Sequence, residues 1–152
     1  MNIENCKYLE CITRKGEVWA QIPGYPYLIS NLGRVYGLER NQLEQGDRTY
    51  NGYHRVTLSK NGKTTHKRIS LLVAEAFCGG VPKGKRVHHI NRHRSDNRAV
   101  NLIVCTEQEH RAIHNLYTIL GAEYVESLTA EQLYRMCHFI VNLCEKIGGE
   151  AA

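Results

Sequence analysis

The sequence has no apolar run long enough to cross a membrane. A membrane-spanning helix needs about 18 or more consecutive apolar residues, and no such run occurs among the 152 residues. The sequence also has no signal-like leader, in which a charged segment precedes an apolar one. We therefore expect no membrane partner and a cytoplasmic location.

The cysteines lack the paired spacing of metal-binding or redox motifs. No C-x-x-C pair occurs, and the six cysteines are scattered at positions 6, 11, 78, 105, 137 and 144. This pattern favours reduced thiols, several of them buried, in a cytoplasmic protein. The 42% hydrophobic and 23% charged residues are typical of a globular chain. The length fits one domain with an appendage or two small modules.

Acidic residues are scarce in the middle of the chain. Residues 48–98 contain twelve Lys or Arg but only two acids, Glu75 and Asp96, whereas the rest of the chain is net negative. A local basic excess of this size is the expected footprint of a nucleic-acid contact, because each neutralised phosphate releases counterions. The alternative is a solvated basic face with no ligand.

Histidine is concentrated in residues 88–114, which read HHINRHRSDNRAVNLIVCTEQEHRAIH and hold five of the eight histidines. Thr106 and Glu109 in this stretch have the spacing of a capping box. The spacing predicts a helix that begins near Glu107, and Gly121 suits its far end. Ligand-bearing residues after Thr106 are therefore expected on a helix.

Four of these histidines are placed to converge. His110 and His114 would lie one turn apart on one face of the predicted helix. His88 and His89 lie in an extended run, where neighbouring side chains point to opposite faces. Only one of them can join the helix pair at a single metal, which leaves the other free to act as a base. A histidine pair on a helix is more often solvent-facing or buried than bound to a metal. The prediction of a metal site therefore depends on the helix pair and the His88–His89 pair lying close together.

The order of His89, Asn101 and His110 resembles the His-Asn-His motif of HNH endonucleases, which have the ββα-metal (His-Me finger) fold. The runs VHHIN, DNRAVNL and TEQEHRAIH are similar to the phage and intron-encoded homing members. The resemblance implies that His89 is the general base. It makes Asn101 the residue that orients the base and braces the hairpin, and it makes His88 and His110 metal ligands. Many homing members carry Asp and Asn at those two ligand positions, and His114 adds a third candidate ligand, as in colicin-type nucleases.

The resemblance implies one divalent metal ion and a phosphodiester substrate. Imidazole ligands suit Zn, Ni, Cu or Fe, whereas Mg and Mn prefer oxygen. Homing members generally use Mg, so Mg, Mn, Zn and Ni are all candidates. We expect a metal-dependent endonuclease that nicks or cuts double-stranded DNA. The alternative is a non-catalytic DNA-binding protein in which the histidines, with Cys105 as a fourth ligand, hold a structural metal.

The segment that begins at Glu17 is rich in aromatic, β-branched and turn residues, which predicts strands. Its W-x-x-I and Y-x-I-S-N-x-G-R-V patterns resemble the small module that often precedes HNH domains in homing endonucleases. Such modules are associated with DNA contact, so the resemblance makes Arg34 a candidate DNA ligand. Tyr27 and Tyr36 are expected in the core rather than on DNA.

Two alternating runs, residues 53–59 and 63–69, flank an Asn-Gly pair at positions 61 and 62. This arrangement predicts a β-hairpin with a type I′ turn, and residues 70–77 after it read as a short apolar helix. A basic hairpin can lie along a DNA groove. Together with two arginines beside the histidines, its basic residues are candidate DNA contacts: Arg55, Lys60, Lys63, Lys67, Arg68, Arg92 and Arg94.

A second capping box, at Thr129 and Gln132, predicts a C-terminal helix that ends at the glycine pair 148–149. Its apolar stripe consists of Leu133, Met136, Cys137, Ile140, Leu143, Cys144 and Ile147. The stripe must be buried, either on the domain or in a homodimer formed through this helix. The sequence thus predicts an α+β protein in three parts: a β-rich module with DNA contact (1–47), an HNH nuclease core with the basic hairpin (48–121), and a C-terminal helix (122–152).

Overall fold

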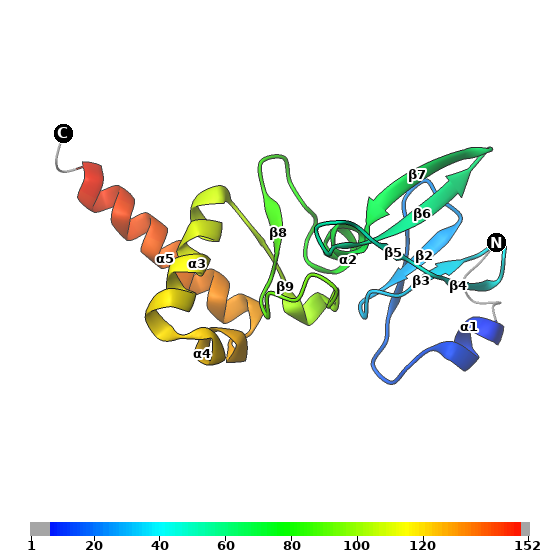
Figure 1. Cartoon of the computed structure of the whole chain (residues 1–152), viewed down its shortest axis with the longest axis horizontal. Helices are drawn as coiled ribbons and strands as arrows, with labels where there is room; N and C mark the ends of the chain where they lie inside the picture. Colours follow the sequence, from blue (N-terminus) through cyan, green and yellow to red (C-terminus); the bar gives the residue numbers. More distant parts are fainter. Residues whose placement is uncertain (1–6, 150–152) are drawn as a thin grey trace.

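The computed structural model of the chain describes residues 7–149 and confirms the expected α+β class (Figure 1). Its antiparallel strands form a four-stranded sheet of order β1-β2-β3-β4, a three-stranded sheet of order β5-β6-β7 and the two-stranded pair β8-β9. Cys6 lies outside the described residues. Within residues 7–149, no helix combines the length and apolar character needed to cross a membrane.

The N-terminal sheet follows a short helix that the sequence did not indicate. The elements in order are α1 (Lys7–Ile12), β1 (Trp19–Gln21), β2 (Tyr27–Ser30), β3 (Val35–Gly37) and β4 (Gln42–Glu44). Tyr27 and Tyr36 are buried, with 4% and 0% of their surfaces exposed, as expected for core residues.

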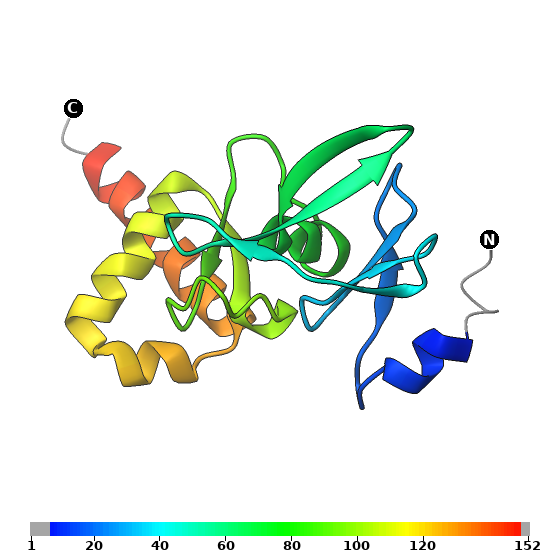
Figure 2. The ribbon, with the colours of Figure 1, turned by 45° about the vertical axis from the view of Figure 1, so that its right-hand side comes forward.

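The basic hairpin continues from the first sheet and reaches out beside it (Figure 2). The hairpin consists of β6 (His54–Lys60) and β7 (Lys63–Arg68), and the short strand β5 (Asp47–Arg48) pairs with β6 to complete a three-stranded sheet. Helix α2 (Ile69–Phe77) follows β7. Asn61 and Gly62 have φ values of 51° and 73°. Both residues therefore adopt the left-handed conformation that a type I′ turn requires, which confirms the predicted hairpin.

A β-hairpin and a helix form the centre of the molecule. The strands β8 (Arg86–His89) and β9 (Leu102–Cys105) pair antiparallel, with the short helix η2 (Ala99–Asn101) before β9 and α3 (Glu107–Leu120) after it. The pair lies between α2 and α3 (Figure 1). The Thr106 hydroxyl accepts from the Glu109 backbone N–H at 3.2 Å, and the Glu109 carboxylate accepts from the Thr106 N–H at 2.8 Å. The predicted capping box is thus confirmed.

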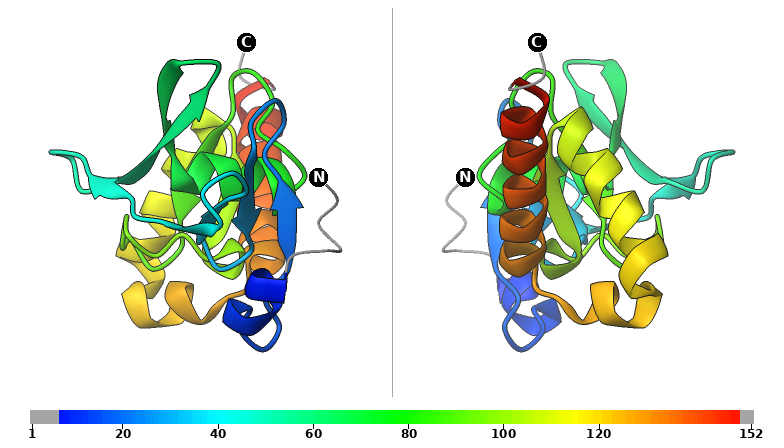
Figure 3. Two further views of the ribbon diagram at one scale, coloured as in Figure 1. Left: turned by 90° about the vertical axis from the view of Figure 1, so that its right-hand side faces the viewer. Right: turned by 90° about the vertical axis from the view of Figure 1, so that its left-hand side faces the viewer.

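The C-terminal part is helical and packs on the domain. After α3 come α4 (Ala122–Ser127), which the sequence did not indicate, and the predicted α5 (Ala130–Gly149). Helix α5 packs along α3 (Figure 3). Leu133 and Cys137 are fully buried there, whereas Leu143 and Ile147 are 45% and 63% exposed. The first half of the predicted stripe is therefore covered by the chain itself.

Two hydrophobic cores meet at the β8–β9 hairpin. Leu102 packs with Ile29 of the first sheet, Val56 of the basic hairpin and residues of α2. Ile103, the next residue, packs with Ile113 and other residues of α3, α4 and α5. This alternation follows from the two faces of a strand. Because Ile29 and Leu102 share one core, the N-terminal module packs against the hairpin that carries His88 and His89.

Candidate active site at the β8–β9 hairpin

The register of the β8–β9 pair separates the two adjacent histidines. His88 lies opposite Ile103, and His89 lies opposite Leu102. Directly opposite residues of an antiparallel pair project from the same face of the sheet. Because Ile103 packs toward α3 and Leu102 toward α2, His88 faces α3 and His89 faces the other side. As expected, only one of the two adjacent histidines lies beside the helix pair, and this residue is His88.

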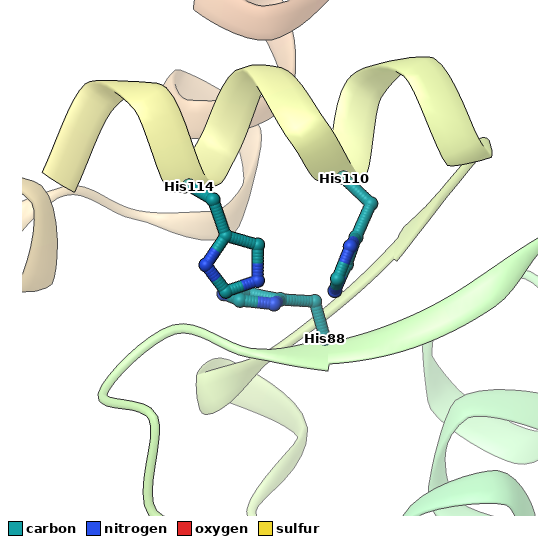
Figure 4. Close-up of side chains that lie close together, drawn as sticks. All are labelled: His88, His110 and His114. Atoms are coloured by element: carbon teal, nitrogen blue, oxygen red, sulfur yellow. The ribbon is translucent and has the colours of Figure 1, made fainter. Parts of the chain in front are cut away.

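Three imidazoles gather where α3 crosses β8 (Figure 4). One ring nitrogen from each of His88, His110 and His114 lies within 4.8 Å of the others. Two nitrogens on one ion bound at about 2.1 Å would be roughly 3–4 Å apart, so small side-chain rotations would bring the three onto a shared ion. Within residues 7–149, the cluster consists of imidazoles alone, and this donor set suits a transition metal.

The electrostatics of the cluster favour neutral imidazoles. Burial, followed by the nearby imidazoles of His110 and His114, lowers the pKa of His88 to about 3. Burial, followed by His114, also lowers the pKa of His110. A neutral imidazole is the form that binds a metal, so these shifts favour the metal-binding form of His88 and His110.

Tyr117 closes the inner side of the cluster. Its hydroxyl donates to the backbone carbonyl of Ile90 and lies 3.5 Å from Nε2 of His88. Burial raises the pKa of Tyr117 to about 12. The hydroxyl therefore stays protonated at neutral pH and borders His88 on the side away from solvent.

His89 is held by an asparagine. Its Nε2 lies 3.0 Å from Oδ1 of Asn97, and both residues are at most 5% exposed. An amide oxygen can only accept, so Nε2 carries the hydrogen and Nδ1 keeps a free lone pair. Burial lowers the pKa of His89, although the bond to Asn97 opposes this shift. His89 is therefore neutral near pH 7 and has one nitrogen available as a base.

Asn101 braces the hairpin, as the family resemblance implied, whereas the side chain that holds His89 belongs to another asparagine. Its side chain accepts from the Asn91 N–H at 2.9 Å and donates to Asn91 Oδ1 and to the Asp96 carbonyl, both at 2.8 Å. These bonds brace the segment that links the two strands. The contact with His89 is made by Asn97 instead, whose role sequence reasoning missed although the pair of asparagines was visible.

The N-terminal module reaches this asparagine through a glycine. Gly33, in the turn between β2 and β3, has a φ of +77°, and a Cβ there would lie 3.0 Å from Asn97 Cβ and 3.1 Å from its carbonyl oxygen. The Ala99 N–H donates to the Asn31 carbonyl at 2.8 Å beside it. The turn thus packs directly behind the residue that holds His89.

Both histidine sites open into one cleft of about 740 Å³. Its lining includes all four candidate histidines together with several basic side chains and Tyr53: His88, His89, His110, His114, Tyr53, Arg68, Lys85, Arg86, Arg92 and Arg94. A pocket with this basic lining suits an anionic ligand such as a phosphodiester.

The predicted hairpin contacts are divided between two faces. Arg55 lies opposite Arg68, whereas Lys67 lies opposite the buried Val56. Because side chains alternate along a strand, the two arginines share one face and the lysines share the other: Lys60, Lys63 and Lys67. The candidate DNA contacts of the hairpin therefore lie on two opposite faces. Only the arginine face includes a residue that lines the cleft.

Three predicted DNA contacts form ion pairs within the protein, and one of them, Arg55, pairs with Asp47 at 2.7 Å. Arg34 donates to Glu17 at 2.7 Å, lies 5.6 Å from the Trp19 ring centre and has a side chain only 17% exposed. It stabilises the first sheet and is poorly placed to meet DNA. Arg92 pairs with Glu126 at 3.4 Å but still lines the cleft.

Comparison with known proteins agrees with this geometry. Residues 67–112 match the family described as HNH endonuclease, and residues 17–59 match the NUMOD4 motif. The chain is 34% identical over 92 residues to DNA endonuclease I-HmuI of Bacillus phage SP01, which covers 59% of this chain and 53% of I-HmuI. It is 36% identical over 118 residues to HNH endonuclease L247 of Acanthamoeba polyphaga mimivirus, which covers 71% of this chain and 29% of that protein.

A solved structure, described as DNA binding and cleavage by the HNH homing endonuclease I-HmuI, is similar in fold with a TM-score of 0.60. The match is 30% identical and covers 68% of this chain and 60% of that chain. The chain spans about half the length of I-HmuI itself. The histidines of the ββα unit lie inside or directly beside the matched segment. Residues 67–112 therefore form an HNH endonuclease domain of the phage type, in which a NUMOD4 motif precedes the nuclease domain.

Proposed function

We propose that the chain is a metal-dependent endonuclease that cleaves double-stranded DNA, with His89 as general base. One observation carries the proposal: the three-imidazole cluster and His89 project from opposite faces of β8 yet open into the same basic cleft. A phosphodiester in this cleft could contact a bound ion on one side and a base on the other.

His89 would activate the attacking water. Asn97 holds its Nε2–H, so Nδ1 is the atom that takes the proton as the water oxygen attacks phosphorus. The bond from phosphorus to the 3′ oxygen then breaks, and this oxygen takes up a proton from solvent. The family resemblance implies a 5′ phosphate and a 3′ hydroxyl as the products. Asn97 keeps the imidazole in the productive tautomer and stabilises its charged form.

His88, His110 and His114 would hold the divalent ion, since their nitrogens are the convergent donors of the cleft. When bound, the ion would supply Lewis-acid stabilisation of charge on the phosphate and on the departing oxygen. The donor set favours Zn, Ni or another transition metal over Mg, although Mg and Mn stay within the proposal. Because burial lowers the pKa of His88, the ion would not have to displace a proton from this ligand.

The non-catalytic alternative has less support. A closed structural site would need a fourth protein ligand, and Cys105 was the predicted candidate. Cys105 is fully buried in the core formed with α3 and α5, and burial raises its pKa to about 12. Its thiol is thus protonated and outside the imidazole cluster found within residues 7–149. An open site of three ligands suits catalysis better.

One active site per chain leads us to expect nicking by a single protein molecule. Cleavage of both strands would require a second event or a second copy. The exposed end of α5 is a place where two copies could meet, and homodimerisation through it stays a prediction.

The test is incubation of supercoiled plasmid with purified protein and each of Mg, Mn, Ni and Zn, beside a chelator control. We expect open-circle product with at least one ion and none with the chelator. The variant His110→Ala should need a higher concentration of the ion for the same rate. No conversion with any ion, while the protein still binds DNA, would contradict the proposal and favour the non-catalytic alternative.

A further inference from the structure

Two arginine side chains lie over the ring of Tyr53, which is next to His89 in the cleft. The guanidinium carbon of Arg68 lies 4.4 Å from the centre of the Tyr53 ring, and that of Arg94 lies 4.9 Å from the same centre. The ring itself lies 6.0 Å from the imidazole of His89, centre to centre. All four side chains line the same cleft. Residues from three separate segments of the chain thus converge beside the proposed base.

These two arginines differ from the others at the cleft. Arg86 pairs with Glu107, and Arg92 pairs with Glu126. Neither Arg68 nor Arg94 forms an ion pair with a carboxylate anywhere in residues 7–149. Both side chains are exposed. Their positive charges are therefore left for a ligand to neutralise.

The local structure fixes these groups. Thr49 holds both backbone polar groups of Tyr53. The Tyr53 N–H donates to the Thr49 hydroxyl at 3.1 Å, and the Tyr53 carbonyl accepts from the Thr49 N–H at 2.8 Å. Arg94 donates one N–H to the Asn51 carbonyl at 2.7 Å, and a guanidinium has four more to offer. Two cations on one aromatic ring are each attracted to the ring but repel each other. An anion between them would remove this repulsion.

On this basis, and on the proposed function, we propose that Arg68 and Arg94 form a clamp for a DNA backbone phosphate beside His89, with Tyr53 as the residue that positions both. Guanidinium groups match phosphate oxygens in pairs and contact them through short, charge-assisted hydrogen bonds. The clamp would fix the strand that is cut, so that the phosphorus lies in reach of the water activated by His89.

The test measures binding of a fluorescent DNA duplex, without metal, over a range of salt concentrations. We expect Arg68→Ala and Arg94→Ala each to weaken binding about tenfold and to reduce the salt slope by about 0.9. Tyr53→Leu should weaken binding as well, and in that background each arginine substitution should have a smaller effect. Tyr53→Phe keeps the ring and should bind as wild type does. Arg135→Ala, which removes a charge on α5 away from the cleft, is the control.

The outcomes separate the clamp from the proposed function. If wild type binds DNA but the salt slope is unchanged in both arginine variants, the clamp is refuted while the nuclease proposal stands. Variants with a lower melting temperature but wild-type affinity would show that the arginines only stabilise the fold, which also refutes the clamp. Failure of wild type to bind DNA at all would overturn both.

Discussion

Replacing each of the two asparagines near the base by alanine should separate orientation of His89 from bracing of the hairpin. Asn97 gives His89 its one side-chain hydrogen bond within residues 7–149, at 3.0 Å. In the reaction that bond is made to an imidazolium, and hydrogen bonds to charged groups contribute about 1.5–3 kcal/mol. Asn97→Ala should therefore lower kcat about 10- to 150-fold. Asn97 also donates to the Ser95 carbonyl at 3.3 Å, so the loss of two neutral hydrogen bonds should lower the free energy of unfolding by about 2 kcal/mol.

Asn101→Ala should behave in the opposite way. The side chain of Asn101 is buried and makes three hydrogen bonds of 2.8–2.9 Å to Asn91 and Asp96. At about 1 kcal/mol each, their loss should lower the free energy of unfolding by about 3 kcal/mol. For a chain of this size, that corresponds to a melting temperature roughly 6–12 °C lower. We expect kcat to stay within about threefold of wild type while the protein is folded.

The assay combines thermal melting, metal titration and the initial rate of plasmid nicking, measured well below the melting temperature of the weaker variant. Metal affinity should be unchanged in both variants, because neither asparagine is part of the imidazole cluster. The reasoning is refuted if Asn101→Ala loses more than tenfold in kcat while Asn97→Ala stays within twofold of wild type. That result would return the orienting role to Asn101.

Four further substitutions test the site and its support. His110→Ala should weaken metal affinity about 10- to 100-fold by titration calorimetry and leave DNA affinity unchanged, and equal metal affinity would exclude His110 as a ligand. Gly33→Ala should lower kcat, because the new Cβ would lie only 3.0 Å from the Cβ of Asn97 and the backbone there has a φ that favours glycine. An unchanged kcat would contradict the supporting role of this turn. Leu133→Ala should destabilise the fold by about 2–5 kcal/mol in urea unfolding, because Leu133 is fully buried. Leu143 is half-exposed, so Leu143→Ala should destabilise the fold by less than about 0.5 kcal/mol. Similar losses in the two variants would contradict the observed burial of α5.

The features that could be predicted from the sequence are those fixed by neighbours in the chain. The capping box at Thr106 sets where α3 begins, and the helical repeat then puts His110 and His114 on one face. The Asn61-Gly62 turn sets the hairpin register in the same way. Local hydrogen bonds and backbone preferences decide such features, so a short window of sequence contains the needed information.

The features that could not be predicted depend on distant packing. The contact between Asn97 and His89 depends on the path of the segment between the strands, which the turn at Gly33 supports from far along the chain. Arg34 looked free for DNA in the sequence because its partner Glu17 lies in another segment. Long-range contacts of this kind leave no local periodic signal.

The most direct test of the central claim compares wild type with His89→Ala in the same plasmid assay, with metal and DNA affinities measured on both proteins. We predict that His89→Ala binds the ion and DNA as wild type does and loses about 10²- to 10⁴-fold in cleavage rate, the usual share of a general base. Cleavage at the wild-type rate by metal-saturated His89→Ala would contradict the account, because the base would then have to be another group.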